Sequence, residues 1–303
     1  MTNQNLAGMR IDHVLLTRFN LPSGGAESLI RAEEGWLRDR VALFERYTVP
    51  SVRWQTAADV RWIVYFDPES PDWLVDRLSR YVDEGTFVAL YRESVSWRDV
   101  VADAHAISAG DGGVLVTTNV DNDDALAVDF AQRVQEVART GFRGAIYLER
   151  GLIQRDRQIY LRRDPDNAFC SVAEPWTGAM TAWRDWHVLL HHHMPTTTVS
   201  GAPGWLQVVH GRNVSNRIRG RLIDGEVYAS LFPGMLADLP VPSLAALSAD
   251  RYLHRPMREA RELVRRLVKN VVLGVGGKGG LERLSQMLAA SRRRLRGPDD
   301  PTR

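Results

Sequence analysis

The stretch GVLVTTNVDNDDAL, residues 113–126, decides the fold class. Its apolar part, from 113 to 120, is typical of a buried strand and ends directly in a turn that carries Asp121, Asp123 and Asp124. Apolar residues at helical spacing follow the turn. A buried strand, a polar turn and a helix in this order are typical of an α/β sheet.

The same pattern recurs on both sides of this stretch, where apolar runs alternate with segments that have helical spacing. Parallel neighbours need crossover helices, so we expect an α/β fold with a mostly parallel central sheet flanked by helices. The expected strands are 11–20, 62–67, 87–91, 113–120 and 144–149, and the expected helices carry Leu37, Val41 and Phe44, then Leu74, Leu78, Tyr81 and Val82 after Ser70 as N-cap, then Leu126, Phe130, Val134 and Val137.

The second half of the chain departs from this alternation. We expect a hairpin that leaves the parallel sheet at 152–163, and then a loop with a short helix that ends at Pro195, at 173–195. One more apolar strand is expected at 205–210, and two amphipathic helices are expected at 256–272 and 281–296. The expected domains are a nucleotide-sugar and acceptor domain over residues 1–225 and a basic helical extension over residues 226–303.

Composition excludes several classes of protein. A single cysteine, Cys170, excludes an internal disulfide and any site with several thiolate ligands. No apolar run approaches the roughly 18 residues of a membrane span, and the N-terminus has no signal-peptide core, so we expect a cytoplasmic protein. Residues 251–303 hold 14 Arg and Lys against 5 Asp and Glu. This confinement of basic charge to one tail argues against a nucleic-acid partner.

The basic tail has two interpretations. The cluster of Arg292, Arg293, Arg294 and Arg296 follows Leu281, Leu284 and Leu288, a combination that favours peripheral contact with anionic lipid at the inner face of the membrane. An ordinary surface helix is the alternative.

The acidic turn favours a cation. Three carboxylates within four positions repel one another, and a hard cation such as Mg²⁺ or Mn²⁺ relieves that repulsion. Asp123 is the first choice of metal ligand, and Asp121 is expected to face a ribose or to share the metal. The alternative is a solvated turn in which Asp124 caps a helix that begins at Ala125.

A family resemblance becomes visible at this point. The succession HVLLTRFNLP, TVPSVRWQ, WIVYFDPESPDWL, VTTNVDNDDAL and WLQVVHGRNVSNR resembles the putative rhamnosyltransferase family, over about residues 11–220. The resemblance implies a GT-A-like nucleotide-sugar-binding fold and metal-dependent transfer of a sugar from a nucleotide donor, with DNDD as the Asp-x-Asp motif. The implied partners are a dTDP-, UDP- or GDP-sugar and a saccharide or another hydroxyl acceptor.

Residues at the other strand ends are expected to complete a donor site, since ligands of such sheets bind beyond the carboxyl ends of the strands. The planar guanidinium of Arg18 suits a phosphate or a base, and Phe19 could stack on a base. Asp67 could bond a base or ribose edge, or could simply cap the turn before Pro68.

His210 ends the strand 205–210 and is expected to return to the Asp-x-Asp motif. If that strand lies beside the strand 113–120 in the same orientation, His210 becomes a third metal ligand. Arg212 and Asn213, which follow it, are expected to contact the diphosphate.

The catalytic base is harder to place. An inverting transfer needs a carboxylate or an imidazole to take the proton of the acceptor hydroxyl. Glu174, in a predicted loop, is the preferred candidate, and Asp185 and His187 are the others.

Two other classes of function stay open. DNDDA partly matches the Asp-x-Asp-x-Thr pattern of phosphohydrolases with an aspartate nucleophile, although position 125 is Ala and both lysines, Lys269 and Lys278, lie far downstream. The third class is a non-catalytic binding protein.

Overall fold

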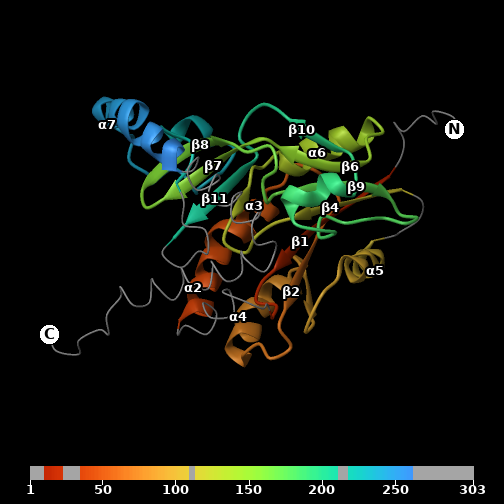
Figure 1. Cartoon of the computed structure of the whole chain (residues 1–303). Helices are drawn as coiled ribbons and strands as arrows, with labels where there is room; N and C mark the ends of the chain where they lie inside the picture. Colours follow the sequence, from red (N-terminus) through yellow and green to blue (C-terminus); the bar gives the residue numbers. More distant parts are fainter. Residues whose placement is uncertain (1–9, 23–34, 109–112, 211–217, 262–303) are drawn as a thin grey trace, which may run out of the picture.

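The computed structural model describes residues 10–22, 35–108, 113–210 and 218–261, which form two β-sheets and the helices packed on them (Figure 1). The larger sheet has seven strands in the order β10-β6-β9-β4-β1-β2-β3. Its strands are β1 (Ile11–Arg18), β2 (Val60–Phe66), β3 (Val88–Tyr91), β4 (Val114–Asn119), β6 (Gly144–Leu148), β9 (Ser171–Pro175) and β10 (Thr196–Val199).

The α/β class predicted from the sequence is confirmed, but the sheet is mixed. Strands β1, β2, β3 and β4 are parallel to one another where they pair, and β6 is parallel to β10. Strand β9 runs antiparallel to both β4 and β6. The prediction of a loop at the start of 173–195 is therefore wrong, because these residues fill the gap between two parallel pairs.

Helices cover both faces of the larger sheet. On one face, alternate strand residues such as Leu15 and Val64 pack in one buried cluster with the apolar sides of α2, α4 and α6. On the other face, Val14 and Ile63 pack with α5 and with the segment that follows β9. The helices are α2 (Trp36–Leu43), continued by η2 (Phe44–Thr48) and α3 (Val49–Arg53), then α4 (Asp72–Asp83), α5 (Trp97–Ile107), α6 (Phe130–Arg139) and η3 (His187–His192).

The second sheet has five strands in the order β12-β8-β7-β11-β5. The predicted hairpin is confirmed, since β7 and β8 pair antiparallel. Strand β11 lies in this sheet, parallel to β7 and antiparallel to β5, so the predicted position of 205–210 beside β4 is wrong. The strands are β5 (Ala125–Leu126), β7 (Arg150–Arg155), β8 (Gln158–Arg163), β11 (Trp205–Val209) and β12 (Arg221–Ile223).

The described part of the predicted C-terminal extension contacts the second sheet from its beginning. Phe232, Met235 and Leu236 are buried in one cluster with residues of β5, β7, β8 and β11. The elements after β12 are η4 (Glu226–Tyr228), α7 (Leu244–Ala249) and η5 (Asp250–His254), and residues 255–261 continue η5 as a helix. Within the described residues no helix is both long enough and apolar enough to span a membrane. The predicted helix 281–296, its arginine cluster and most of the helix 256–272 lie outside the described residues.

Candidate functional site

The Asp-x-Asp turn lies where β1 and β4 end, and its shape is fixed by hydrogen bonds to the neighbouring segments. Val120 donates its N–H to the carbonyl of Leu16 at 2.9 Å, which continues the β1–β4 ladder. The Asn122 side chain donates to the carbonyls of Arg18 and Phe19. These bonds explain why Asp121 is exposed while the next three side chains of the turn are buried.

Asp123 is held between two basic side chains. The guanidinium of Arg40, from α2, forms an ion pair with Oδ2 of Asp123, and the side chains are only 11% and 7% exposed. Nε2 of His210 lies 3.0 Å from the same oxygen. Burial opposes ionisation, but the hydrogen bond with His210 and the charge of Arg40 hold the pKa of Asp123 below its ordinary value.

The register of the second sheet explains how His210 comes to this turn. Strand β11 pairs antiparallel with β5, with Leu206 opposite Ala125. Antiparallel partners run in opposite directions, so the residues after Leu206 return along the residues before Ala125. His210 thus meets the acidic turn from the second sheet. Its role as a metal ligand stays a prediction.

Asp121 is the exposed residue of the turn and lies next to the end of β1. Burial around its carboxyl group and the charge of Asp123 raise the pKa of Asp121 to about 6, while Asn119, Arg40 and Arg18 oppose the rise. Asn119 donates to Oδ1 of Asp121 at 3.2 Å. Asn119 therefore positions the carboxyl group of Asp121, a residue that is exposed as a whole.

Arg18 is positioned by an aromatic ring. Its guanidinium carbon lies 4.2 Å from the ring centroid of Trp183, and the indole N–H of Trp183 donates to Asn119 at 2.7 Å. The predicted position of Arg18 beside the acidic turn agrees with this arrangement. Trp183 and Arg40 are site residues that the sequence analysis missed, because only the fold brings them to residues 119–123.

Asp124 does not cap a helix. Residues 125 and 126 form β5, and α6 begins only at Phe130. The carboxylate of Asp124 instead accepts the backbone N–H of Val208 at 2.8 Å, which joins the turn to β11. Burial and then the charges of Asp123 and Asp121 raise the pKa of Asp124 well above its ordinary value. This side chain is a structural link between the two sheets.

Phe19 is wrong as a base-stacking residue. Its side chain is fully buried, with ring centroids 5.1 Å from those of both Phe44 and Phe66. Its N–H still bonds the carbonyl of Tyr65, so the chain stays in the sheet for one more residue and the ring enters the core. Asp67, at the end of β2, accepts the N–H of Glu69 at 2.8 Å, which is the turn-capping alternative.

Glu174 is wrong as the catalytic base, because β9 is antiparallel to β4. Glu174 pairs with Leu115, whereas Ser171 pairs with Thr118 at the end that leads to Asp121. At about 3.3 Å per residue, the six positions from Leu115 to Asp121 place Glu174 roughly 20 Å from the turn. Glu174 therefore lies near the end of these strands that is opposite to the acidic turn.

The other two base candidates lie in the segment that Trp183 fixes beside Asn119. Asp185 accepts from His193 at 2.8 Å, and this hydrogen bond, followed by one from the N–H of Trp186, holds the pKa of Asp185 below its ordinary value. Burial lowers the pKa of His187, so its imidazole is neutral at neutral pH. Both stay predictions. Arg212 and Asn213 lie outside the described residues.

The residues of the turn fit one kind of metal site. Among the described residues, no group of three or more His, Cys, Asp and Glu side chains is arranged to hold a metal ion. Mg²⁺ in nucleotide enzymes is usually bound by one or two carboxylates, with phosphate oxygens of the substrate and water as its remaining ligands. Asp121 and Asp123 supply that smaller set. They fit a cation that binds together with a diphosphate, in competition with Arg40.

Comparison with known proteins decides the family. The model of the family described as "Putative rhamnosyl transferase" matches residues 12–222, which is most of the chain. The chain belongs to this family. The match includes the Asp-x-Asp turn, Arg18, Arg40 and His210. No curated protein matches the chain.

Several solved structures align with part of this chain. TarS 1–349 of S. aureus aligns at 9% identity with a TM-score of 0.42, over 65% of this chain and 60% of that one. The same fragment in complex with UDP-GlcNAc aligns at 9% identity with a TM-score of 0.40, over 66% and 59%. A putative glucose-1-phosphate thymidylyltransferase of Bacillus anthracis aligns at 11% identity with a TM-score of 0.31, over 77% and 98%. The chain therefore spans about 60% of the length of the TarS fragment.

Proposed function

We propose that this member of the rhamnosyltransferase family transfers a sugar from a nucleoside-diphosphate donor to a hydroxyl group of an acceptor, with Mn²⁺ or Mg²⁺ held by Asp121 and Asp123. One observation carries the proposal. The Asp-x-Asp turn at the ends of β1 and β4 is surrounded by basic side chains from three separate parts of the chain, namely Arg18, Arg40 and His210.

The surroundings of the turn are suited to a diphosphate. A departing nucleoside diphosphate gains negative charge, and stabilising that charge is usually the largest contribution to such a reaction. Arg18 is stacked on Trp183, and its planar guanidinium is of the kind that binds phosphate oxygens through two parallel hydrogen bonds. Asp121 has the exposed carboxylate that a ribose hydroxyl or a cation requires. When bound, the metal would supply a Lewis acid at the diphosphate.

The acceptor side is assigned to the segment after β9. Asp185 and His187 are the candidates for the group that takes the proton of the acceptor hydroxyl. Hydrogen bonds from His193 and from the N–H of Trp186 lower the pKa of Asp185, and burial lowers the pKa of His187. His210 and Arg40 hold Asp123 in place while the donor is absent.

A thermal-shift screen with UDP, GDP, dTDP and CDP, each with and without Mn²⁺, tests the donor. A ligand that binds only the folded state at a hundredfold excess over Kd stabilises it by about 2.7 kcal/mol. We expect one nucleotide to stabilise the wild type, and to do so only with Mn²⁺. The exposed side chain of Asp76 on α4 provides the control, since Asp76→Asn should keep the response that Asp121→Asn loses. No response to any nucleotide in the wild type would contradict the proposal.

The two alternative functions have their own outcomes. An aspartate-nucleophile phosphohydrolase would release phosphate from phosphomonoesters and would not release nucleoside diphosphate from nucleotide sugars. A non-catalytic binding protein would keep its full biological activity when both Asp121 and Asp123 are replaced by Ala. The family match favours the transferase over both.

A further inference from the structure

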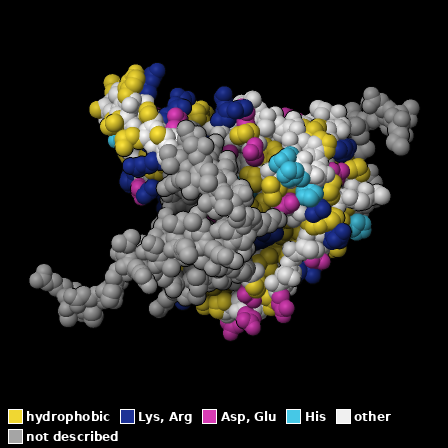
Figure 2. Space-filling model, viewed as in Figure 1, with side chains coloured by type: hydrophobic (Ala, Val, Ile, Leu, Met, Phe, Trp, Pro, Cys, Tyr) yellow, Lys and Arg dark blue, Asp and Glu magenta, His cyan; other side chains and the backbone are white. Residues whose placement is uncertain are grey.

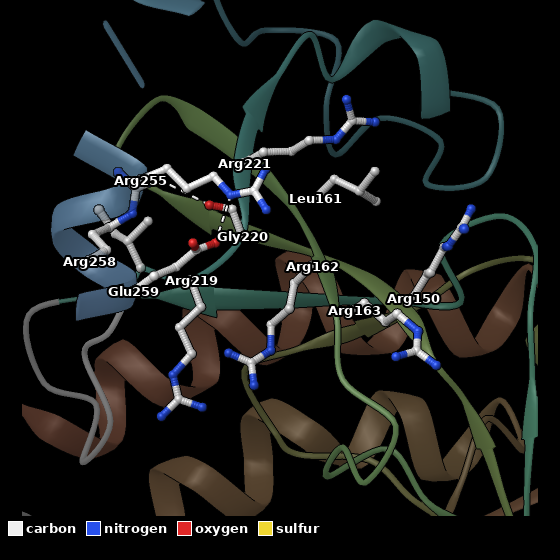
Figure 3. Close-up of a pocket in the computed structure, with 11 residues that line it drawn as sticks. Arg150, Leu161, Arg162, Arg163, Arg219, Gly220, Arg221, Arg255, Arg258 and Glu259 are labelled. Carbon is white, nitrogen blue, oxygen red and sulfur yellow. Dashed lines mark hydrogen bonds and ion pairs between the residues drawn. The ribbon is translucent and has the colours of Figure 1, made fainter. Parts of the chain in front are cut away.

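A cavity of about 670 Å³ lies on the second sheet, and arginine side chains dominate its lining (Figure 3). None of the residues that surround Asp123 contributes to it. Basic side chains also gather at the molecular surface around α7 and the neighbouring strands, at the upper left of Figure 2. The lining residues are Arg150, Leu161, Arg162, Arg163, Ile218, Arg219, Gly220, Arg221, Arg255, Arg258 and Glu259, which we call the arginine pocket.

The second sheet and the helix after η5 bring these arginines together. Arg221 lies opposite Leu161 in the β12–β8 pair. Just before it, Gly220 has a φ of +88°, and a Cβ there would lie 2.2 Å from the carbonyl oxygen of Leu161. Only glycine fits this close approach of two strands. Figure 3 shows the guanidinium groups of Arg162 and Arg219 pointing to the same side of the pocket.

Within the part of the chain that the structure describes, arginines outnumber the carboxylates that contact the arginine pocket. Seven arginines line it, together with one carboxylate, Glu259, which pairs with Arg255 at 2.7 Å. Three carboxylates outside the lining, Glu149, Asp164 and Asp250, pair with lining arginines at 2.7 Å each. Among the described residues, Arg150 and Arg221 have no carboxylate within ion-pair distance, so these two side chains give the pocket an excess of positive charge. Like charges held this close raise the free energy of the folded state unless anions neutralise them.

Two arginines also have donors that a ligand could satisfy. The Nε–H groups of Arg162 and Arg258 are buried and have no hydrogen-bond acceptor within the part of the chain that the structure describes. A buried donor left without an acceptor destabilises the folded state. Guanidinium groups bind carboxylate and phosphate oxygens through two parallel hydrogen bonds. Charge and unsatisfied donors therefore point to the same kind of ligand, an anion with several oxygens.

We propose that the arginine pocket binds an anionic part of the acceptor, with at least two phosphate or carboxylate groups. This proposal rests on the proposed sugar transfer for the identity of the ligand as an acceptor. The pocket is of a size that holds a small ligand rather than a single ion. It shares the second sheet with β11, which ends at His210 beside Asp123. The register places Leu161 of the pocket level with Leu206, four positions or roughly 13 Å along the strand from His210, so an acceptor would have to extend along the sheet between the two sites.

Calorimetric titration of the full chain tests the pocket directly. The probes are tripolyphosphate for phosphate groups, oligogalacturonate for carboxylates, and the nucleoside diphosphate with Mn²⁺ for the donor site. The variant R162Q/R219Q removes two pocket charges. R61Q/R98Q removes two exposed arginines that lie outside the pocket and is the matched control. We expect the pocket variant to raise the Kd of the preferred anion at least tenfold and to leave the Kd of the nucleoside diphosphate within twofold.

A second variant, at exposed residues of the pocket, tests the site even if R162Q/R219Q does not fold. Arg150 and Arg221 are exposed lining residues, so R150Q/R221Q should keep the fold and still raise the Kd of the anion. Equal weakening by the control and the pocket variants would overturn the site. Parallel loss of nucleoside-diphosphate binding would assign the pocket to the donor and overturn the acceptor assignment. If the proposed function is wrong, the wild type should bind the anion but no nucleoside diphosphate. That result would contradict the assignment of the anion as part of the acceptor and would leave the anion site itself supported.

Discussion

Replacing Arg40 with Met should reveal how the protein stabilises its acidic turn without a cation. Methionine keeps much of the aliphatic packing of Arg40 but removes the charge that neutralises Asp123. Removing one partner of a buried ion pair costs about 3–5 kcal/mol, since the other charge stays buried. His210 still donates to Asp123 from 3.0 Å, so the lower end of this range applies. We expect Arg40→Met to lower the free energy of unfolding by about 3 kcal/mol.

Urea denaturation of a double-mutant cycle isolates this pair. In Arg40→Met/Asp123→Asn neither charge remains, so the double variant should be more stable than the sum of the two single effects implies, by about 2 kcal/mol. Arg77→Met is the control, because Arg77 pairs with Glu45 from a side chain that is 53% exposed and such pairs contribute at most about 1 kcal/mol. Mn²⁺ with the nucleoside diphosphate should stabilise Arg40→Met more than the wild type, since the guanidinium no longer competes. A loss below 1 kcal/mol, or additive effects, would refute the reasoning.

Three further predictions concern single side chains. Burial lowers the pKa of His13 to about 3, so the stability due to its neutral form is complete above pH 6.5 and should fall on acidification toward pH 3. In urea titrations between pH 7 and 5, the free energy of unfolding of the wild type should fall by about 2 kcal/mol more than that of His13→Gln. Equal losses in the two proteins would contradict this. Asp124→Asn should lower the free energy of unfolding by less than about 1 kcal/mol, because the amide oxygen still accepts the N–H of Val208. Asp124→Ala removes this acceptor and should lower it by about 1–3 kcal/mol. Equal losses in urea denaturation would contradict the structural role of Asp124. For the catalytic base, His187→Gln or Asp185→Asn should lower kcat by about 10²-fold or more, and unchanged rates in both variants would remove this segment from the chemistry.

The central strands of the larger sheet were predictable because they are buried on both faces. The run 62–66 is wholly apolar and is followed by Asp67, and the run 113–120 contains four apolar side chains and is followed by Asp121, so strand and turn are visible without the fold. The second sheet was less visible. Strands β5 and β12 have two and three residues, which is too short for any periodicity.

The start of helix α5 is visible in the sequence as a capping box. Ser96 caps the N–H of Asp99, and the Asp99 carboxylate accepts the N–H of Ser96, a capping box that the spacing Ser-x-x-Asp announces. The N-cap predicted at Ser70 is wrong by one residue. Pro71 takes that position, while the hydroxyl of Ser70 donates to the carbonyl of Asp67.

The acidic turn and the positions of Arg18 and His210 beside it were predictable from the sequence, but the contact with Arg40 was not. Asp121 and Asp123 follow a buried strand, which a local pattern reveals. Arg40 meets Asp123 across 83 positions of the sequence, and no local pattern contains that contact. Glu174 was misplaced for a related reason, because the direction of β9 depends on its pairing partners.

The most direct test of the account is the release of nucleoside diphosphate from the nucleotide sugar that the binding screen identifies, measured with Asp123→Asn and the wild type side by side. The substitution keeps the shape of the side chain but removes the charge that would hold the cation. The account predicts that Asp123→Asn lowers the rate at least 10²-fold, which corresponds to about 2.7 kcal/mol of transition-state stabilisation, and that EDTA abolishes the activity of the wild type. Equal rates for both proteins, with EDTA inhibiting neither, would contradict it.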